Sequence, residues 1–147
     1  MKIPPDARIA ICIIPVFILF LLCSCSDSSS PESDWENIGV QQVFVEQLDI
    51  PDTSTTVDTL SIGISGVTET TGLLTLSTIE AERTSDDVTL TIWAEVKKWV
   101  GSGIMPTIDP SIQCTYKAIP PFASGIFYII VEQPDGAQMI DSLLIES

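Results

Sequence analysis

The chain has 147 residues, with 20 acidic against 6 basic side chains, no histidine and a formal net charge of -14. This length favours one compact domain, and the lack of histidine excludes Ser-His-Asp and Cys-His nucleophiles and histidine-containing zinc sites. The acidic balance also argues against nucleic acid as a partner, because that affinity depends on Lys and Arg contacts to phosphate.

The first 24 residues have the layout of a signal peptide. Lys2 and Arg8 form a short basic start, and residues 9–22 form an apolar run. As a helix, this run covers only about 21 Å, which is too short to cross the ~30 Å hydrocarbon core of a bilayer. An uncleaved N-terminal anchor, or a signal peptide cut after a small residue, stays open as the alternative.

The apolar run ends in Leu22-Cys23-Ser24-Cys25. This segment resembles the lipobox of bacterial lipoproteins, in which a small residue precedes the cysteine that receives lipid. Cys25 fits the pattern, whereas Cys23 follows Leu22 and does not. The resemblance implies removal of residues 1–24, a diacylglycerol on Cys25 and attachment to a membrane of the cell envelope. Ser26 after the cysteine implies the outer membrane if the host is Gram-negative.

Residues 25–37 are expected to form the lipidated cysteine and a flexible acidic tether. Residues 26–36 carry four acids and no base. Their one large apolar residue, Trp35, is expected either to dock on the domain or to close the tether, because the segment alone buries too little surface to offset its ordering entropy. Loss of residues 1–24 leaves 19 acids and 4 bases. We therefore expect acyl chains, rather than attraction to lipid charge, to hold the protein at the membrane.

From about residue 38 to residue 147 the apolar residues recur with a period of two, which is typical of β-strands with one buried face. The alternating segments lie at residues 43–45, 60–65, 74–81 and 88–96. In the third of these the parity changes near Ser77-Thr78, which indicates a β-bulge.

The last part of the chain has a different pattern. Residues 126–131 are apolar at every position and are expected to form a central strand covered on both faces. Gln133-Pro134-Asp135-Gly136 is typical of a hairpin turn, and a final strand is expected at residues 139–145.

About seven strands separated by Gly, Pro and Asp predict an all-β fold, an antiparallel β-sandwich. The segments that match a known pattern are Arg83-Thr84, Val88-Thr89-Leu90, Cys114 and residues 125–131. They resemble the immunoglobulin-like or fibronectin-type domains of bacterial lipoproteins. The resemblance implies an immunoglobulin-like β-sandwich over residues 38–147, without the Cys-Trp-Cys framework of antibody domains.

One cluster combines basic and aromatic residues: Trp93, Lys97, Lys98 and Trp99. It is the candidate surface for an envelope protein or a glycan, because exposed aromatic rings stack on sugars or anchor partners. The alternative is a sheet edge that lysines protect from pairing, with tryptophans that cap the core. The loop that follows, rich in Gly and Pro, is expected to be mobile and to lie where sandwich domains often bind.

The carboxylates and the cysteine give further candidates. Glu80 and Glu82 are two apart in a strand and are expected to share a face, as a catalytic pair needs, although a solvated face is the simpler interpretation. Asp86-Asp87 is expected in a turn, and no calcium-binding run is present, so we expect no metal and no cofactor. Cys114 is expected to be a small buried residue, with a reactive thiol as the alternative.

These patterns predict a lipid-anchored protein of the cell envelope that acts as a binding or assembly module and not as an enzyme. Carbohydrate binding or minor hydrolase activity is the alternative, and a concave site shared by Trp93 or Trp99 with Glu80, Glu82 or Glu95 favours it. A purely structural spacer is favoured if both tryptophans are buried and no patch is exposed.

Overall fold

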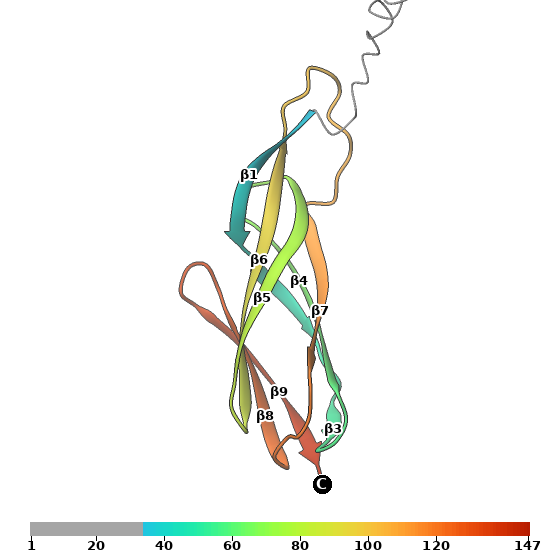
Figure 1. Ribbon diagram of the computed structural model, residues 1–147, viewed down its shortest axis with the longest axis vertical. Helices are drawn as coiled ribbons and strands as arrows, with labels where there is room; N and C mark the ends of the chain where they lie inside the picture. The colour runs from blue at the N-terminus through green and yellow to red at the C-terminus, as the bar shows by residue number, and fades with distance from the viewer. Residues whose placement is uncertain (1–33) are drawn as a thin grey trace, which may run out of the picture. The chain divides into compact units, whose positions relative to one another are not determined.

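The computed structural model describes residues 34–147, which form nine β-strands and no α-helix (Figure 1). The strands are β1 (Trp35–Gln42), β2 (Phe44–Asp49), β3 (Thr53–Thr55), β4 (Leu60–Val67), β5 (Leu73–Arg83), β6 (Asp87–Trp99), β7 (Ser111–Ala118), β8 (Gly125–Glu132) and β9 (Gln138–Glu146). The predicted all-β class is confirmed, but seven strands is too low a number. The two strands that the sequence pattern did not predict are β1, which lacks alternating apolar residues, and β3, which has only three residues.

The folded domain begins three residues before the expected boundary at residue 38. Trp35 is already in β1, where its ring meets that of Trp99 edge to face with centroids 5.3 Å apart. Of the two expected roles of Trp35, docking on the domain is therefore the correct one. The predicted signal peptide and Cys25 lie outside the described residues.

Six strands form one sheet, and its long central strand is β6. β5 pairs with β6 along one edge, while β1 and β8 pair with the two halves of its other edge. Most pairings are antiparallel, but β8 runs parallel to β6 and β3 runs parallel to β9. The expectation of a purely antiparallel fold was therefore wrong for these two pairs.

The second sheet has three antiparallel strands in the order β2-β4-β7. The chain crosses from the first sheet to the second at Val43, which is fully buried and whose N–H donates to the carbonyl of Ile92 at 2.9 Å. One continuous stretch of chain thus supplies a strand to each sheet, and this ties the two sheets together at that edge.

The core lies between the two sheets and is formed by alternate residues of both. The fully or almost fully buried aliphatic side chains of the strands are Val45, Leu60, Ile62, Ile64, Val88, Leu90, Ile92, Val96, Ile112, Ile129, Val131, Leu143 and Ile145. Phe122 and Phe127 pack edge to face at the lower end of the core, with centroids 5.2 Å apart. Each such aliphatic side chain contributes about 1.5–3 kcal/mol through its removal from water.

Two local predictions are confirmed. The register between β5 and β6 shifts between Leu76 and Thr78, which is the bulge expected near Ser77-Thr78. The turn after β8 is the expected hairpin: Gln133 and Ala137 pair through their backbones, and Gly136 has a φ of +80°, which favours glycine.

One prediction about β8 was wrong. Phe127, Ile129 and Val131 are buried, but Ile126 is 59% exposed and Tyr128 is 44% exposed. Only one face of β8 meets the other sheet, because no described element covers the opposite face. The apolar residues of that uncovered face therefore form a surface feature of the domain.

Candidate functional site

The predicted basic-aromatic cluster is split between the two faces of β6. Ala94 and Val96 are buried in the core, so Trp93, Lys97 and Trp99 lie on the outer face of the six-stranded sheet. Lys98 has the opposite parity and is exposed beyond the end of the core. The four residues therefore do not form one surface, and Lys98 does not belong to the face that carries the tryptophans.

Trp99 is held in place by its neighbours. Its ring contacts Trp35 and also occupies the space above Gly101, where an added Cβ would overlap the indole ring. The residue is half-buried in this arrangement. Trp99 thus closes one end of the domain and does not present a free ring to a ligand.

Trp93 has a different setting, because it lines a hollow of about 320 Å³ on the outer face of the six-stranded sheet. Glu80 from β5, Thr91 from β6 and Glu132 from β8 line the same hollow. The indole Nε1–H of Trp93 is buried and has no hydrogen-bond partner in the described structure. Trp93 and Glu80 therefore share one concave site, whereas Trp99 and Glu95 do not line it.

A second hollow of about 180 Å³ adjoins the first and shares Glu80, Thr91 and Glu132 with it. It adds Glu82, which lies on the same face of β5 as Glu80, as predicted. The hydroxyl of Thr91 donates to Glu132 Oε2 at 3.4 Å. Glu132 was not predicted for this site, because it comes from a strand that is distant in the sequence.

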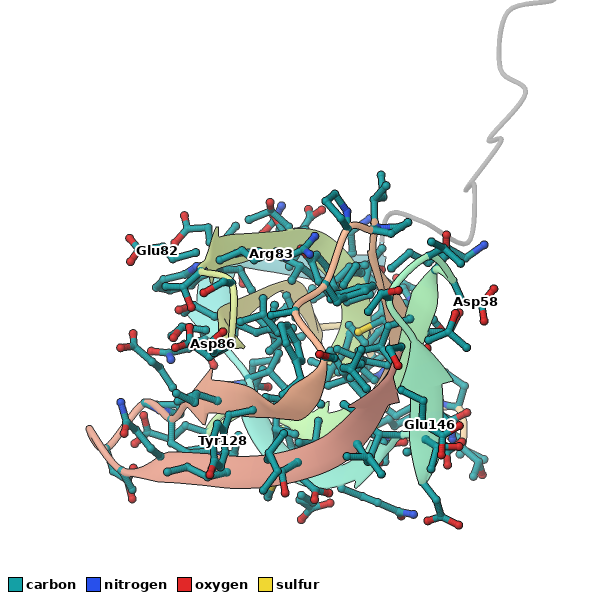
Figure 2. The ribbon with its side chains drawn as sticks, turned by 90° about the horizontal axis from the view of Figure 1, so that it is seen from below. Asp58, Glu82, Arg83, Asp86, Tyr128 and Glu146 are labelled. Carbon is teal, nitrogen blue, oxygen red and sulfur yellow. The ribbon has the colours of Figure 1, made fainter. Side chains whose placement is uncertain are left out.

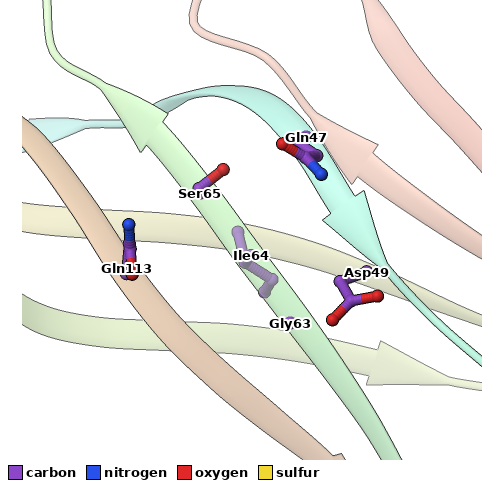
Figure 3. Close-up of a pocket in the computed structure, with 6 residues that line it drawn as sticks. All are labelled: Gln47, Asp49, Gly63, Ile64, Ser65 and Gln113. Atoms are coloured by element: carbon purple, nitrogen blue, oxygen red, sulfur yellow. The ribbon is translucent and has the colours of Figure 1, made fainter.

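A third hollow, of about 230 Å³, lies on the outer face of the three-stranded sheet (Figure 3). Gln47 and Asp49 of β2 border it on one side, and Gln113 of β7 borders it on the other. The floor is open because Gly63 has no side chain and Ser65 has a small one. The lining is mainly polar and contains no aromatic ring, so it offers hydrogen bonds without an apolar anchor.

The uncovered faces of β8 and β9 form a continuous apolar patch, which we name the outer strip. It consists of Ile126, Tyr128, Ile130, Ile140 and Leu144. Ile126 pairs with Leu144 and Ile130 with Ile140 across the two strands, so their side chains are neighbours on one face. The exposed fractions are 59% for Ile126 and Ile140 and about 45% for Tyr128 and Leu144.

Acidic residues surround the outer strip. Glu132 follows Ile130 on the same face of β8, and Glu146 follows Leu144 on β9. Asp87 is the β6 partner of Tyr128, and the backbone carbonyl of Asp86 accepts the N–H of Tyr128. Figure 2 shows Glu82, Asp86 and Tyr128 along one side of the domain, with Asp58 on the other. The outer strip is thus an apolar centre with acidic edges.

The remaining candidates have structural roles. Thr84 Oγ1 accepts the N–H groups of Asp86 and Asp87, so this pair lies in the expected turn. Cys114 is half-buried against the core, and burial raises the pKa of its thiol above the ordinary value. A thiol that is protonated at neutral pH fits the predicted role of a small packed residue.

Arg83 stabilises the connection between β7 and β8. Its guanidinium lies 4.3 Å from the centroid of the Phe122 ring and donates to the backbone carbonyls of Ile119 and Pro121. This is a structural use of one of the few basic side chains in the domain.

Within residues 34–147 no group of three or more His, Cys, Asp or Glu side chains is placed to hold a metal ion. In the same part of the chain no helix has the length and apolar character needed to span a bilayer.

No family model matches the sequence, and neither the curated proteins nor the solved structures contain a significant match. Function is therefore inferred from the sequence and the geometry of the described residues.

Proposed function

We propose that the chain is a lipid-anchored protein of the cell envelope, with an immunoglobulin-like β-sandwich that acts by binding and not by catalysis. The lipid anchor rests on the lipobox that ends in Cys25. Eight residues separate Cys25 from Asp34, where the described domain begins. Such a short connection suits a domain that works close to its membrane.

The immunoglobulin-like assignment is supported by several features. Two sheets share one core, and the chain passes from one sheet to the other between β4 and β5, β6 and β7, and β7 and β8. The parallel pairing of β6 with β8 departs from the antiparallel pattern of this architecture. A purely structural spacer is disfavoured, because Trp93 and Trp99 are only half-buried and the outer strip is exposed.

The observation that carries the binding function is the outer strip. Monomeric proteins rarely leave contiguous apolar side chains from two paired strands uncovered unless a partner covers them. The acidic edges select the partner by charge: we propose a protein surface with an apolar centre and Lys or Arg around it. For a lipid-anchored protein this partner is another component of the envelope.

Site-specific photocrosslinking in isolated membranes tests this function. Benzoylphenylalanine replaces Tyr128 in the outer strip and, as the matched control, Lys117 on the exposed edge of β7. We expect one defined adduct from position 128 that disappears in an Ile126→Ser/Leu144→Ser background, and none from position 117. Equal adducts from both positions, or none from position 128, would contradict the proposal.

A second candidate function is sugar binding in the Trp93 hollow, favoured because an indole ring, two carboxylates and a threonine line one cavity. Titration with cellotetraose and chitotetraose, followed by tryptophan fluorescence, tests it. A saturable change that is lost in Trp93→Ala and retained in Lys117→Ala supports this function. An unchanged spectrum at millimolar sugar rules it out for these ligands.

A further inference from the structure

The loop between β6 and β7, residues 100–110, has an unusual surface. Ile104 is 97% exposed, Val100 is 52% exposed and Met105 is 48% exposed. The loop contains a single charged residue, Asp109, although the chain carries a formal net charge of -14. Adjacent, exposed Ile and Met side chains in an uncharged segment need an apolar surrounding to be favourable.

This loop lies at the end of the domain where β1 begins. The N–H of Val100 donates to the carbonyl of Asp34 at 2.8 Å, and Trp99, directly before the loop, packs on Trp35. Figure 1 shows the loop beside the start of β1, with the C-terminus at the opposite end. The first residue of the domain and the loop are thus joined by direct contacts.

The length of chain that precedes the domain brings this end close to the proposed lipid anchor. Eight residues separate Cys25 from Asp34. Nine residue steps span at most about 30 Å when fully extended and on the order of 15–18 Å as a flexible chain. A bilayer that holds the acyl chains of Cys25 is therefore within reach of the end that carries Ile104 and Met105.

We infer that loop 100–110 docks on the lipid bilayer, with the side chains of Ile104 and Met105 inserted at the interface between headgroups and acyl chains. The inference rests on the lipid anchor of the proposed function. Trp35 and Trp99 lie at the base of the loop, and tryptophan is the residue type that favours this interface. The loop adds a second, non-covalent contact that orients the domain on its membrane.

The charges around the loop determine which lipids it needs. Lys97 and Lys98 lie next to it, but Glu36 is the strand partner of Lys98, and Asp34 and Asp109 are close along the chain. The acids offset the lysines, so attraction to anionic headgroups does not drive this contact. We expect docking on neutral and anionic bilayers alike, and little effect of salt.

Site-specific fluorescence on the full-length, lipidated protein tests the inference. Ile104→Cys and, separately, Met105→Cys are introduced in a Cys114→Ala background and labelled with an environment-sensitive dye. Asp135→Cys in the β8-β9 turn is the matched control. Each protein is reconstituted in phosphatidylcholine vesicles, with and without phosphatidylglycerol, that contain a nitroxide-labelled lipid. We expect a blue shift and several-fold stronger quenching at positions 104 and 105 than at position 135.

Intact-mass analysis of the same samples separates two kinds of failure. A mass without acyl chains contradicts the lipid anchor of the proposed function. A lipidated protein whose dyes at positions 104 and 105 are quenched no more than the dye at position 135 overturns the docking of the loop. So does a blue shift that appears only when another membrane protein is added, because the loop then binds a protein and not lipid.

Discussion

The side-chain amide of Gln133 pairs with the backbone of Val45 through two hydrogen bonds. The N–H of Val45 donates to Oε1 at 3.0 Å, and Nε2 donates to the Val45 carbonyl at 2.9 Å. A side chain from the β8-β9 turn thus acts as a strand neighbour for β2, where the register of β2 shifts between Val45 and Gln47. The two sheets are joined on this side by a glutamine.

We predict that Gln133→Ala destabilises the domain by about 1–3 kcal/mol, because both backbone groups of Val45 lose a partner in a part-buried site. Gln113→Ala, at an exposed position on β7, is the control and is expected to change the free energy of unfolding by less than about 0.5 kcal/mol. Urea unfolding of both variants measures the difference. Equal free energies would show that water replaces the glutamine without cost.

We predict that Gly66→Ala is severely destabilising. A Cβ at position 66 would overlap the backbone carbonyl of Phe44 and crowd the side chain of Val43. Overpacking of this kind typically costs about 1–3 kcal/mol or more, since neither β2 nor the buried Val43 can move freely. Gly103→Ala is the matched control, because nothing lies within 4 Å of its added Cβ. Thermal denaturation should separate the two variants clearly.

Neighbouring isoleucines on the two faces of β8 should respond differently to truncation. Ile129 is 0% exposed, so Ile129→Ala is expected to cost about 2–5 kcal/mol. Ile126 belongs to the outer strip, and Ile126→Ala is expected to cost less than about 1 kcal/mol. Chemical denaturation gives both values. A large loss of stability from Ile126→Ala would mean that the outer strip serves folding and is not a free surface.

The pKa of Asp109 gives a prediction about pH. Hydrogen bonds from the hydroxyl and the N–H of Ser111 favour the ionised carboxylate and lower this pKa below its ordinary value of 3.8. The associated stabilisation is present above that value and is lost as pH falls through the lowered pKa. Ser111→Ala should raise the pKa in an NMR titration, whereas Ser102→Ala in the same loop should leave it unchanged.

The alternating segments were predictable because burial of one face imposes a period of two, and Leu60, Ile62 and Ile64 are indeed all buried in β4. β1 was not predictable in this way, because it is held to β6 by backbone pairing and carries mostly polar side chains. The uncovered face of β8 was misread for a related reason. An apolar run reads the same whether a second layer of protein covers it or not.

The candidate sites were predictable only within a single strand. The shared face of Glu80 and Glu82 follows from strand geometry, and so does the separation of Lys98 from Trp99, which a strict reading of parity gives. The arrival of Glu132 beside Glu80 depends on how β8 pairs with β6, and this pairing leaves no local signal in the sequence. The outer strip required the same long-range knowledge.

The pairing of β3 with β9 has a consequence for biosynthesis. Thr53 is joined to Leu144, so an early segment of the domain finds its neighbour only after almost all of the chain has emerged. The core residues Leu143 and Ile145 arrive at the same late stage. Pairings between such distant segments slow folding, because a long loop must close before its contacts form. A ribosome or translocation channel therefore releases this domain incomplete, and a holding chaperone has a defined interval in which to act.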